Sequence, residues 1–245
     1  MELLTASLIS APHGFPTRNG GVSAAPYDSL NSSSAVGDQE AAVRVNLERL
    51  AVAAGVEPER LRFVKQVHGD RVVEASDATP ETEADALWTE QAGLAVGVRT
   101  ADCLPVLIED PRGRVAAVHA GWRGVLAEIV ARTIEQLVAR GAKVNELKGA
   151  IGPCIQRCCF EVDGDLPARF TAAFGSGVLA PRGGSKPHLD LPYAVKQTLT
   201  RLGVPAGHMA VLPQCTSCDE RFFSHRRERG ITGRHLSFIT CRGEL

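Results

Sequence analysis

Cys103 and His119, a thiol and an imidazole that can bind a metal or share a proton, lie on either side of a short predicted turn. Two apolar segments flank Asp110-Pro111-Arg112-Gly113, and Asp-Pro-x-Gly is turn chemistry with proline at its favoured second position. This pattern predicts an antiparallel hairpin that sets Cys103 and Leu104 opposite Ala120 and His119. Cys103 and His119 are then cross-strand neighbours, since opposed Cβ atoms lie about 4.5–5.5 Å apart. A shift of one residue in this register would put them on opposite faces.

A third candidate ligand, His68, stands at the polar end of a predicted strand, 61–67. Thiolate and imidazole are both good zinc donors, and three protein ligands leave the fourth position of the ion for water or substrate. His68, Cys103 and His119 therefore predict a catalytic zinc site. Their long, irregular spacing is a weak signal without the hairpin, because a single histidine at a strand end commonly hydrogen-bonds to the backbone.

The same hairpin also suits a metal-free enzyme. Cys103 would be the nucleophile and His119 the base of a thiol hydrolase or deamidase. That arrangement leaves His68 without a role, whereas zinc uses all three side chains. Zinc is therefore the preferred interpretation, and metal content would distinguish the two.

Three helices and six strands are predicted to position these residues. The first helix follows the N-cap Asp38 and ends at Gly55; the second covers 125–140 and ends at Gly141; the third runs from the N-cap Asp190 to Leu202. The predicted strands are 61–67, 94–98, 104–108, 115–119, 210–212 and 236–240. No repeat or long linker interrupts the pattern, so a single domain over 1–245 is expected.

Composition narrows the class of partner. The chain has 245 residues, a net charge of -1 and 44% hydrophobic residues, which describes an ordinary globular protein without a basic field for nucleic acid or an anionic membrane. No segment has the length of an apolar membrane span, and the first residues lack the positive charge of a signal peptide. The expected location is the cytoplasm and the expected ligand a small molecule.

Seven cysteines are an odd number, which in a reducing compartment indicates thiols or metal ligands. Cys215 and Cys218 form a Cys-x-x-Cys motif, and Cys158 and Cys159 form an adjacent pair. A four-thiolate zinc site usually has two properly spaced pairs. Adjacent cysteines rarely bind one ion together, so small buried thiols are the preferred interpretation.

Long sequence motifs resemble the laccase-domain family of YfiH-type proteins, first described as multicopper polyphenol oxidases and later as purine nucleoside phosphorylases. The match spans nearly the whole chain, and its most specific parts are Thr-Ala-Asp-Cys-Leu-Pro-Val at 100–106 and Val-His-Ala-Gly-Trp-Arg-Gly at 118–124. Further motifs are Thr-Arg-Asn-Gly-Gly-Val-Ser (17–23), Tyr-Asp-Ser-Leu-Asn (27–31), Gly-Asp (37–38), Gln-Val-His-Gly (66–69), Ala-Asp-Ala (84–86), Ile-Gly-Pro (151–153), Phe-Glu-Val (160–162), Phe-Phe-Ser-His-Arg-Arg (222–227) and Thr-Gly-Arg (232–234).

The resemblance implies a single α/β (α+β) domain, with layered mixed and antiparallel β-sheets flanked by helices. It implies a metal site of one cysteine and two histidines, here Cys103, His68 and His119. It also implies phosphorolysis of adenosine, inosine, guanosine and methylthioadenosine, together with adenosine deamination. Some members are proposed to edit miscoupled peptidoglycan precursors, and nothing in this sequence tests that role.

Phosphorolysis needs donors for phosphate. Arg123 is the first candidate, because the turn after His119 opens the second predicted helix beside the metal. Arg226 and Arg227 are the second, since guanidinium groups bind phosphate in a bidentate way. Asp102 and Asp85 are candidates for a general acid or for the carboxylate that orients a metal-bound histidine. Asn31 is a candidate contact to ribose or base, because it lies in a motif that matches the family.

A copper oxidase is disfavoured by the number of histidines. The trinuclear cluster of a laccase takes many histidines, usually in His-x-His pairs, whereas this chain has seven histidines and no such pair. Oxidase activity would then reflect adventitious copper, which outcompetes zinc at nitrogen and sulfur sites in vitro.

Overall fold

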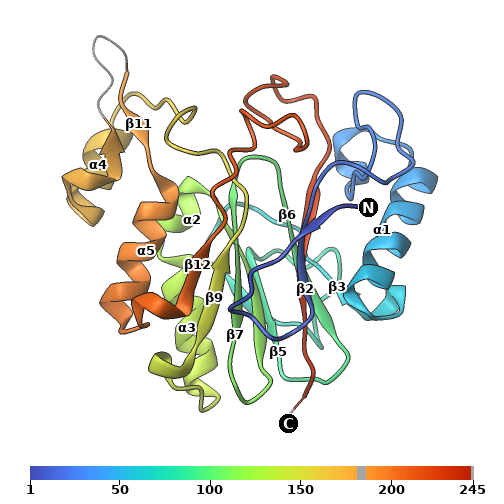
Figure 1. Ribbon diagram of the computed structural model, residues 1–245, viewed down its shortest axis with the longest axis horizontal. Helices are drawn as coiled ribbons and strands as arrows, with labels where there is room; N and C mark the ends of the chain where they lie inside the picture. Colours follow the sequence, from blue (N-terminus) through green and yellow to red (C-terminus); the bar gives the residue numbers. More distant parts are fainter. Residues whose placement is uncertain (181–185, 244–245) are drawn as a thin grey trace.

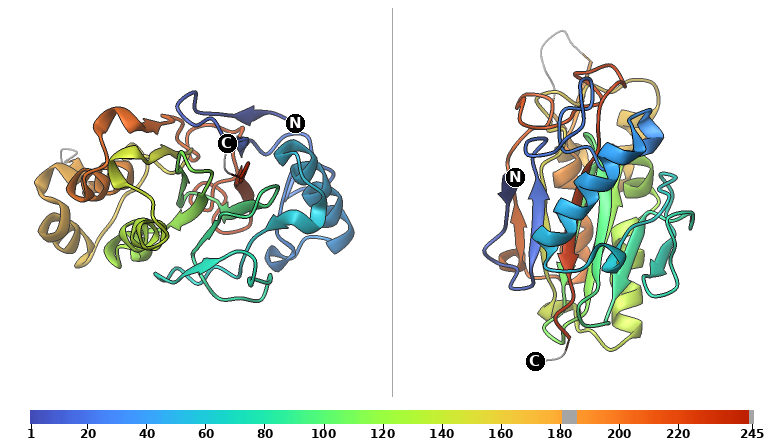
Figure 2. Two further views of the ribbon diagram at one scale, coloured as in Figure 1. Left: turned by 90° about the horizontal axis from the view of Figure 1, so that it is seen from below. Right: turned by 90° about the vertical axis from the view of Figure 1, so that its right-hand side faces the viewer.

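Two facing β-sheets lie between helices, so that four layers stack across the molecule (Figures 1 and 2). The structure is a computed structural model that describes residues 1–180 and 186–243. One sheet has six strands in the order β12-β9-β7-β8-β5-β4, and the other has five in the order β1-β2-β13-β6-β3. The mixed α/β single domain that the sequence predicts is confirmed. Within the described ranges, no helix has the length and apolarity to cross a membrane.

The strands are β1 (Leu3–Leu4), β2 (His13–Pro16), β3 (Leu61–Arg62), β4 (Val72–Glu74), β5 (Ala86–Thr89), β6 (Ala95–Thr100), β7 (Leu104–Glu109), β8 (Val115–Ala120), β9 (Lys148–Ile151), β10 (Leu179–Ala180), β11 (His188–Leu189), β12 (Met209–Val211) and β13 (His235–Thr240). The helices are α1 (Glu40–Ala54), α2 (Trp122–Leu126), α3 (Ile129–Ala139), α4 (Leu166–Phe174) and α5 (Leu191–Leu202). Short 3₁₀ turns occupy Ser34–Val36, Pro58–Arg60, Val144–Glu146, Ser176–Val178 and Ala206–His208.

Strand alternation assigns each side chain to one layer. On β7, Val106 and Ile108 pack under α3 and α5, whereas Leu107 faces the five-stranded sheet. On β8, Ala117 also faces that sheet, and His119, two residues further, therefore points to the same side. Helix α1 covers the other face of the five-stranded sheet through Leu50 and its neighbours. The candidate ligands thus lie where the space between the sheets opens at one end.

The predicted hairpin forms, but its register differs by one residue. Leu104 pairs with Ala120 and Pro105 pairs with His119. Cys103 stands two residues before Pro105, so strand alternation puts Cys103 and His119 on one face as diagonal neighbours. The predicted register would have separated them, because opposed residues share a face. The loop between the paired residues Glu109 and Val115 is therefore one residue longer than the predicted turn over Asp110–Gly113.

Local signals set some helix ends and miss others. Asp190 caps α5 by accepting a hydrogen bond from Tyr193 N at 2.9 Å, and Gly55 and Gly203 end their helices in the left-handed conformation, as predicted. The helix predicted over 125–140 is instead two helices, because Glu128 takes a left-handed conformation with φ 63° between them. Helix α1 starts after Gln39 and not after Asp38. The strand predicted over 61–67 is reduced to Leu61–Arg62.

The buried His235 on β13 makes stability depend on pH. Phe223 N donates to its Nε2 at 2.8 Å, and burial lowers the pKa of His235 to about 3. The unfolded state, with an ordinary histidine pKa of about 6.5, binds the extra proton, so the free energy of unfolding is highest above that pH. We expect it to fall by up to about 1.4 kcal/mol per pH unit as the pH drops below about 6.5.

Urea unfolding between about pH 7 and pH 5 measures this slope. His235→Gln keeps an acceptor for Phe223 N and does not titrate, so its slope should be flatter than that of the wild type. His208→Gln, at a half-buried surface position, should keep the wild-type slope. Equal slopes for wild type and His235→Gln would contradict the assignment.

Candidate functional site

His68, Cys103 and His119 converge from three separate segments. His68 lies in the loop between β3 and β4, Cys103 immediately before β7, and His119 on β8. Their potential ligand atoms all lie within 4.8 Å of one another, and Cys103 Sγ is 4.0 Å from His68 Nε2. The two imidazole rings meet edge to face with centroids 4.8 Å apart. His119 is buried, Cys103 half-buried and His68 exposed, so the group opens to solvent on one side.

Asp85 organises two of these three residues. Its buried carboxylate accepts a 2.7 Å hydrogen bond from His119 Nδ1 and bonds from the backbone N–H groups of Val67 (3.2 Å), His68 (3.0 Å) and Gly69 (2.7 Å). Burial raises the pKa of Asp85, but the bonds from His119 and Gly69 outweigh it and keep the pKa below its usual value. The carboxylate therefore fixes the His119 tautomer and leaves the Nε2 lone pair for a metal or a proton.

The loop that carries His68 is held in an unusual conformation. His68 has φ 60°, a region that residues other than glycine rarely adopt and that costs roughly 1 kcal/mol or more. The three backbone bonds to Asp85 compensate for this cost. Helix α2 also packs closely against this loop. A Cβ added at Gly124 would lie only 3.0 Å from the Gly69 carbonyl oxygen, so the close packing requires glycine at this position. One carboxylate thus orients both candidate histidines.

Cys103 and His119 form a strongly polar pair. Burial raises the pKa of the Cys103 thiol, but the charge and hydrogen bond of His119 and the contact with His68 outweigh it and bring the pKa to about 6. Burial lowers the pKa of His119, but Cys103 and Asp85 raise it to about 9. A thiolate is the form that binds a metal or attacks an electrophile, so the pair suits either chemistry.

The three residues line a cavity of about 560 Å³, within the size range of small-molecule sites. Four arginines from distant segments line the same cavity: Arg99, Arg123, Arg226 and Arg234. Arg99 lies near the end of β6, and its guanidinium carbon is 4.0 Å from the centre of the Phe63 ring. Burial lowers the pKa of Arg99 to about 10. Among the described residues, Arg99 Nε is buried without a hydrogen-bond partner. The wall is suited to an anion.

The structure brings two of the predicted phosphate donors to this cavity. Arg123, on α2, stacks over Trp122 with 4.3 Å from its guanidinium carbon to the ring centre. Arg226 donates to the carbonyl oxygens of Cys159 (3.3 Å) and Glu161 (3.1 Å), which hold its guanidinium in place. Both therefore line the same cavity as His68, Cys103 and His119.

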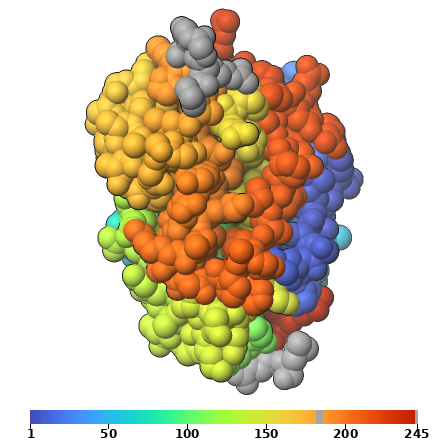
Figure 3. Space-filling model, turned by 60° about the vertical axis from the view of Figure 1, so that its left-hand side comes forward, coloured from blue at the N-terminus to red at the C-terminus, as the bar shows by residue number. Residues whose placement is uncertain are grey.

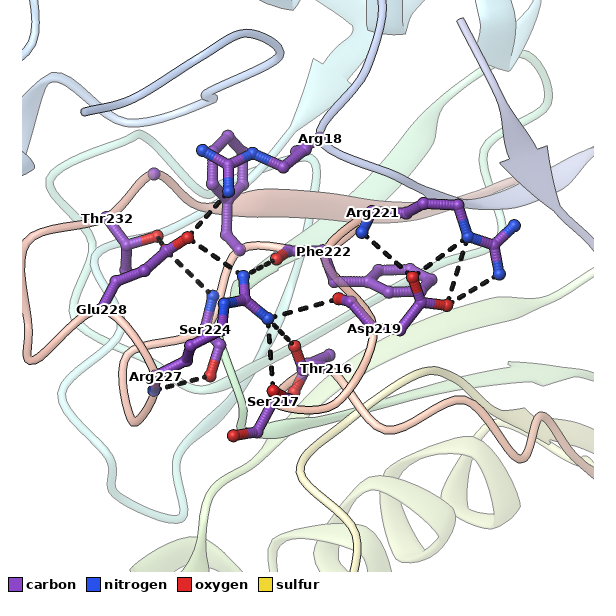
Figure 4. Close-up of polar contacts among 12 residues, drawn as sticks. Arg18, Thr216, Ser217, Asp219, Arg221, Phe222, Ser224, Arg227, Glu228 and Thr232 are labelled. Atoms are coloured by element: carbon purple, nitrogen blue, oxygen red, sulfur yellow. Dashed lines mark hydrogen bonds and ion pairs between the residues drawn. The ribbon is translucent and has the colours of Figure 1, made fainter. Parts of the chain in front are cut away.

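Arg227, the remaining predicted phosphate donor, is not among the residues that line the cavity. Its guanidinium donates to the Thr216 carbonyl at 2.7 Å, to the Phe222 carbonyl and to Glu228 at 3.0 Å (Figure 4). These partners use its donors to fold the loop between β12 and β13. Guanidinium groups that bind backbone carbonyls in this way have few donors left for a ligand. Arg227 is a structural residue of this loop.

Asn31 and Asp102 differ in their place at the site, because Asp102 lines the cavity and Asn31 does not. Asn31 is buried, donates to Ser33 O and Asp38, and accepts from Arg234 N at 2.9 Å, so it positions Arg234 and does not line the cavity itself. Asp102 has φ 83° and accepts from Thr216 Oγ1 and Arg226 N, both at 2.6 Å. Asp85, and not Asp102, is the carboxylate that bonds a candidate ligand histidine.

Sequence reasoning missed Arg99 and Arg234. Arg99 interrupts the apolar run Ala95–Thr100 near its end, and a charged residue at that place was the available signal. Arg234 stands in the Thr-Gly-Arg motif (232–234), but that motif alone did not indicate a cavity residue. Arg234 N donates to Asn31 Oδ1 at 2.9 Å, and the Arg234 side chain lines the cavity.

Comparison with known proteins places this geometry in a family. Residues 12–242 match the family described as multi-copper polyphenol oxidoreductase laccase. The chain belongs to this laccase-like family. A relative from Deinococcus radiodurans, named purine nucleoside phosphorylase, is 41% identical over 98% of this chain and 92% of its own length. A relative of the same kind from Streptomyces coelicolor is 40% identical over 94% of this chain and 95% of its own length.

Solved structures of the laccase-like family share the fold. YlmD from Geobacillus stearothermophilus matches with a TM-score of 0.91 and 34% identity, covering 97% of this chain and 94% of its own. The Bacillus licheniformis hypothetical protein YfiH matches with a TM-score of 0.88 and 33% identity, covering 94% and 92%. The family resemblance seen in the sequence is confirmed.

Proposed function

We propose that this chain is a zinc-dependent purine nucleoside phosphorylase that cleaves adenosine, inosine, guanosine and methylthioadenosine with phosphate and also deaminates adenosine. One observation carries the proposal: two histidines and a cysteine converge in a cavity whose wall holds four arginines. Phosphorolysis requires an anion site and a group that stabilises the departing purine in the same space. The names of the relatives support this reaction class, and the free thiols fit a cytoplasmic enzyme.

The residues present fit a zinc ion. One thiol and two imidazoles are a suitable donor set, and Asp85 leaves His119 Nε2 as the available nitrogen. Gly121 keeps the space open, since a Cβ there would lie 3.2 Å from both Cys103 Sγ and His68 Cδ2. His68, Cys103 and His119 would hold the ion, with Asp85 behind His119. When bound, zinc supplies a Lewis acid that stabilises developing negative charge and lowers the pKa of water.

The arginine wall supplies the second requirement. Phosphate is bound best by guanidinium groups that are already held in position, because less side-chain entropy is lost on binding. Arg226 is held by two carbonyls, Arg99 by the Phe63 ring and Arg123 by the Trp122 ring. These fixed cations would orient phosphate toward the sugar and offset its charge as the glycosidic bond breaks.

A metal-free thiol hydrolase is the second candidate, favoured by the hydrogen bond between Asp85 and His119 and by the low pKa of Cys103, about 6. In that enzyme Cys103 would attack a carbonyl carbon while His119 transfers the proton to the leaving group. It gives His68 and the arginine wall no role. Activity that survives complete removal of metal would favour this candidate.

The test is product analysis with the purified, metal-assayed protein and adenosine, with and without phosphate. Adenine and ribose 1-phosphate that appear only with phosphate would establish phosphorolysis. Inosine formed without phosphate would establish deamination. If folded, zinc-loaded protein forms neither product, the nucleoside proposal is overturned. The thiol hydrolase would then be the candidate to test.

A further inference from the structure

We propose that a second group of side chains, Cys158, Cys159, Cys215 and Cys218, forms a structural zinc site with four thiolate ligands. We call this group the thiol cluster. Its four Sγ atoms all lie within 4.8 Å of one another, and Cys218 Sγ is 3.5 Å from Cys158 Sγ and 3.2 Å from Cys159 Sγ. Sulfur atoms on a tetrahedral zinc ion with ~2.3 Å bonds stand about 3.8 Å apart. The inference does not depend on the proposed function.

The backbone explains why these thiols meet although adjacent cysteines seemed unsuited to one ion. Cys154 and Cys215 pair in a short parallel bridge, and Thr216 N donates to Cys154 O at 3.0 Å, which joins the two segments. A turn follows Cys154, closed by Cys159 N donating to Gln156 O at 2.9 Å. This turn brings both adjacent cysteines beside the Cys-x-x-Cys motif. The sequence analysis expected small buried thiols, whereas the structure groups the four thiols and buries only Cys215 among them.

A backbone donor contacts Cys215 across the two segments. Gln156 N donates to Cys215 Sγ at 3.4 Å. Gln156 lies in the first segment and Cys215 in the second, so this bond joins the two segments beside the bridge between Cys154 and Cys215.

The charges around the thiol cluster also suit a bound ion. On binding, Zn²⁺ would replace the protons of four thiols and release them to solvent, which leaves a net charge of minus two. Arg226 donates to the Cys159 carbonyl oxygen. Arg227 donates to the carbonyl oxygens of Thr216 and Ser217 (Figure 4), so two guanidinium groups lie beside this charge. No such anion exists when the thiols are protonated, so the arginines would stabilise the loaded form in particular.

The thiol cluster is suited to a structural role because four ligands close the coordination shell. It joins the turn after β9 to the loop after β12, segments about 60 residues apart. In the space-filling view the chain after β12, in orange-red, spans the surface between the α5 region and the blue N-terminal segment (Figure 3). Phe160 from the first segment lines the catalytic cavity, and Thr216 from the second holds Asp102 beside Cys103. Zinc in the thiol cluster would therefore stabilise the two segments that supply Phe160 and Thr216 to the cavity wall and its support.

The experiment counts zinc in the full-length protein purified under reducing conditions, using elemental analysis of wild type, Cys218→Ser, Cys103→Ala and a matched control, Cys241→Ser. Cys218 is exposed, so its replacement by serine should not disturb the core. If both sites fill, wild type and Cys241→Ser hold two zinc ions per chain. Cys218→Ser loses one of them and melts at a lower temperature, whereas Cys103→Ala loses the other and keeps the thiol cluster loaded.

Cobalt provides a readout that does not require a folded cluster variant. Co²⁺ bound to Cys103→Ala should give the intense thiolate charge-transfer absorption of a four-sulfur site, because the other site has lost its only thiolate. The proposal is overturned if Cys103→Ala is purified without zinc and shows no such absorption when Co²⁺ is added. It is also overturned if the wild type holds no metal and its intact mass shows a disulfide within the thiol cluster.

Discussion

Replacing Cys103 by alanine is expected to lower kcat/KM for the proposed nucleoside phosphorolysis by at least about 10³-fold and to remove the zinc that we propose Cys103 holds with His68 and His119. The variant should still fold, because the half-buried Cys103 side chain belongs to none of the three apolar clusters of the core. Two neutral imidazoles without the thiolate bind zinc weakly, and they cannot supply the charge that Cys103 contributes. Steady-state kinetics, elemental analysis and thermal melting measure the three expectations.

Cys241→Ala is the matched control for this prediction. Cys241 is a thiol that is more deeply buried than Cys103, and its Sγ donates to the Gly113 carbonyl at 3.1 Å, away from the cavity. Its replacement should cost stability and leave turnover at the wild-type level. Full turnover by Cys103→Ala, with zinc still bound, would show that the site has been assigned to the wrong residues. Lost turnover in Cys241→Ala would show that the effect comes from thiol removal in general.

The sequence predicted the elements whose signals are local. Asp190 and Gly203 mark the ends of α5 because a side-chain cap and a left-handed glycine act within one turn of helix. The hairpin of β7 and β8 followed from its turn residues. Its register depended on one residue of turn length, and that residue decides which face His119 occupies. The break at Glu128 had no local signal, since glutamate is an ordinary helix residue and the left-handed conformation is set by packing.

The candidate site divides in the same way. His68, Cys103 and His119 were found because their residue types carry chemistry wherever they occur. Which arginines face the cavity was not predictable, since Arg226 and Arg227 are neighbours in sequence and only tertiary contacts send one to the cavity and the other to the carbonyls of its own loop. The thiol cluster was missed for the same reason: the pairing of Cys154 with Cys215 joins segments that the sequence leaves far apart.

Asp85→Asn is expected to have the second-largest effect, because one carboxylate serves both histidines. The asparagine oxygen can still accept hydrogen bonds from one side. Its NH₂ group, however, would face another donor, either His119 Nδ1 or the backbone N–H groups of residues 67–69, and no acceptor would lie between them. His119 would then lose its fixed tautomer, and zinc affinity should fall by about 10–100-fold. The free energy of unfolding should also fall by about 1–3 kcal/mol, since a buried donor loses its acceptor.

Asp110→Asn separates the two consequences of Asp85→Asn. Asp110 is similarly buried and lies in the turn between β7 and β8, at the other end of β8 from His119. Its carboxylate accepts from Arg114 Nη1 at 2.7 Å and from Arg112 N at 3.4 Å. Its replacement should lower stability to a similar degree while zinc affinity and kcat stay at wild-type values. If zinc competition with a chelator gave equal affinities for Asp85→Asn and Asp110→Asn, Asp85 would be a structural carboxylate only. A selective loss in Asp85→Asn would show that the bond between Asp85 Oδ1 and His119 Nδ1 makes His119 a metal ligand, because that bond is what distinguishes the two carboxylates.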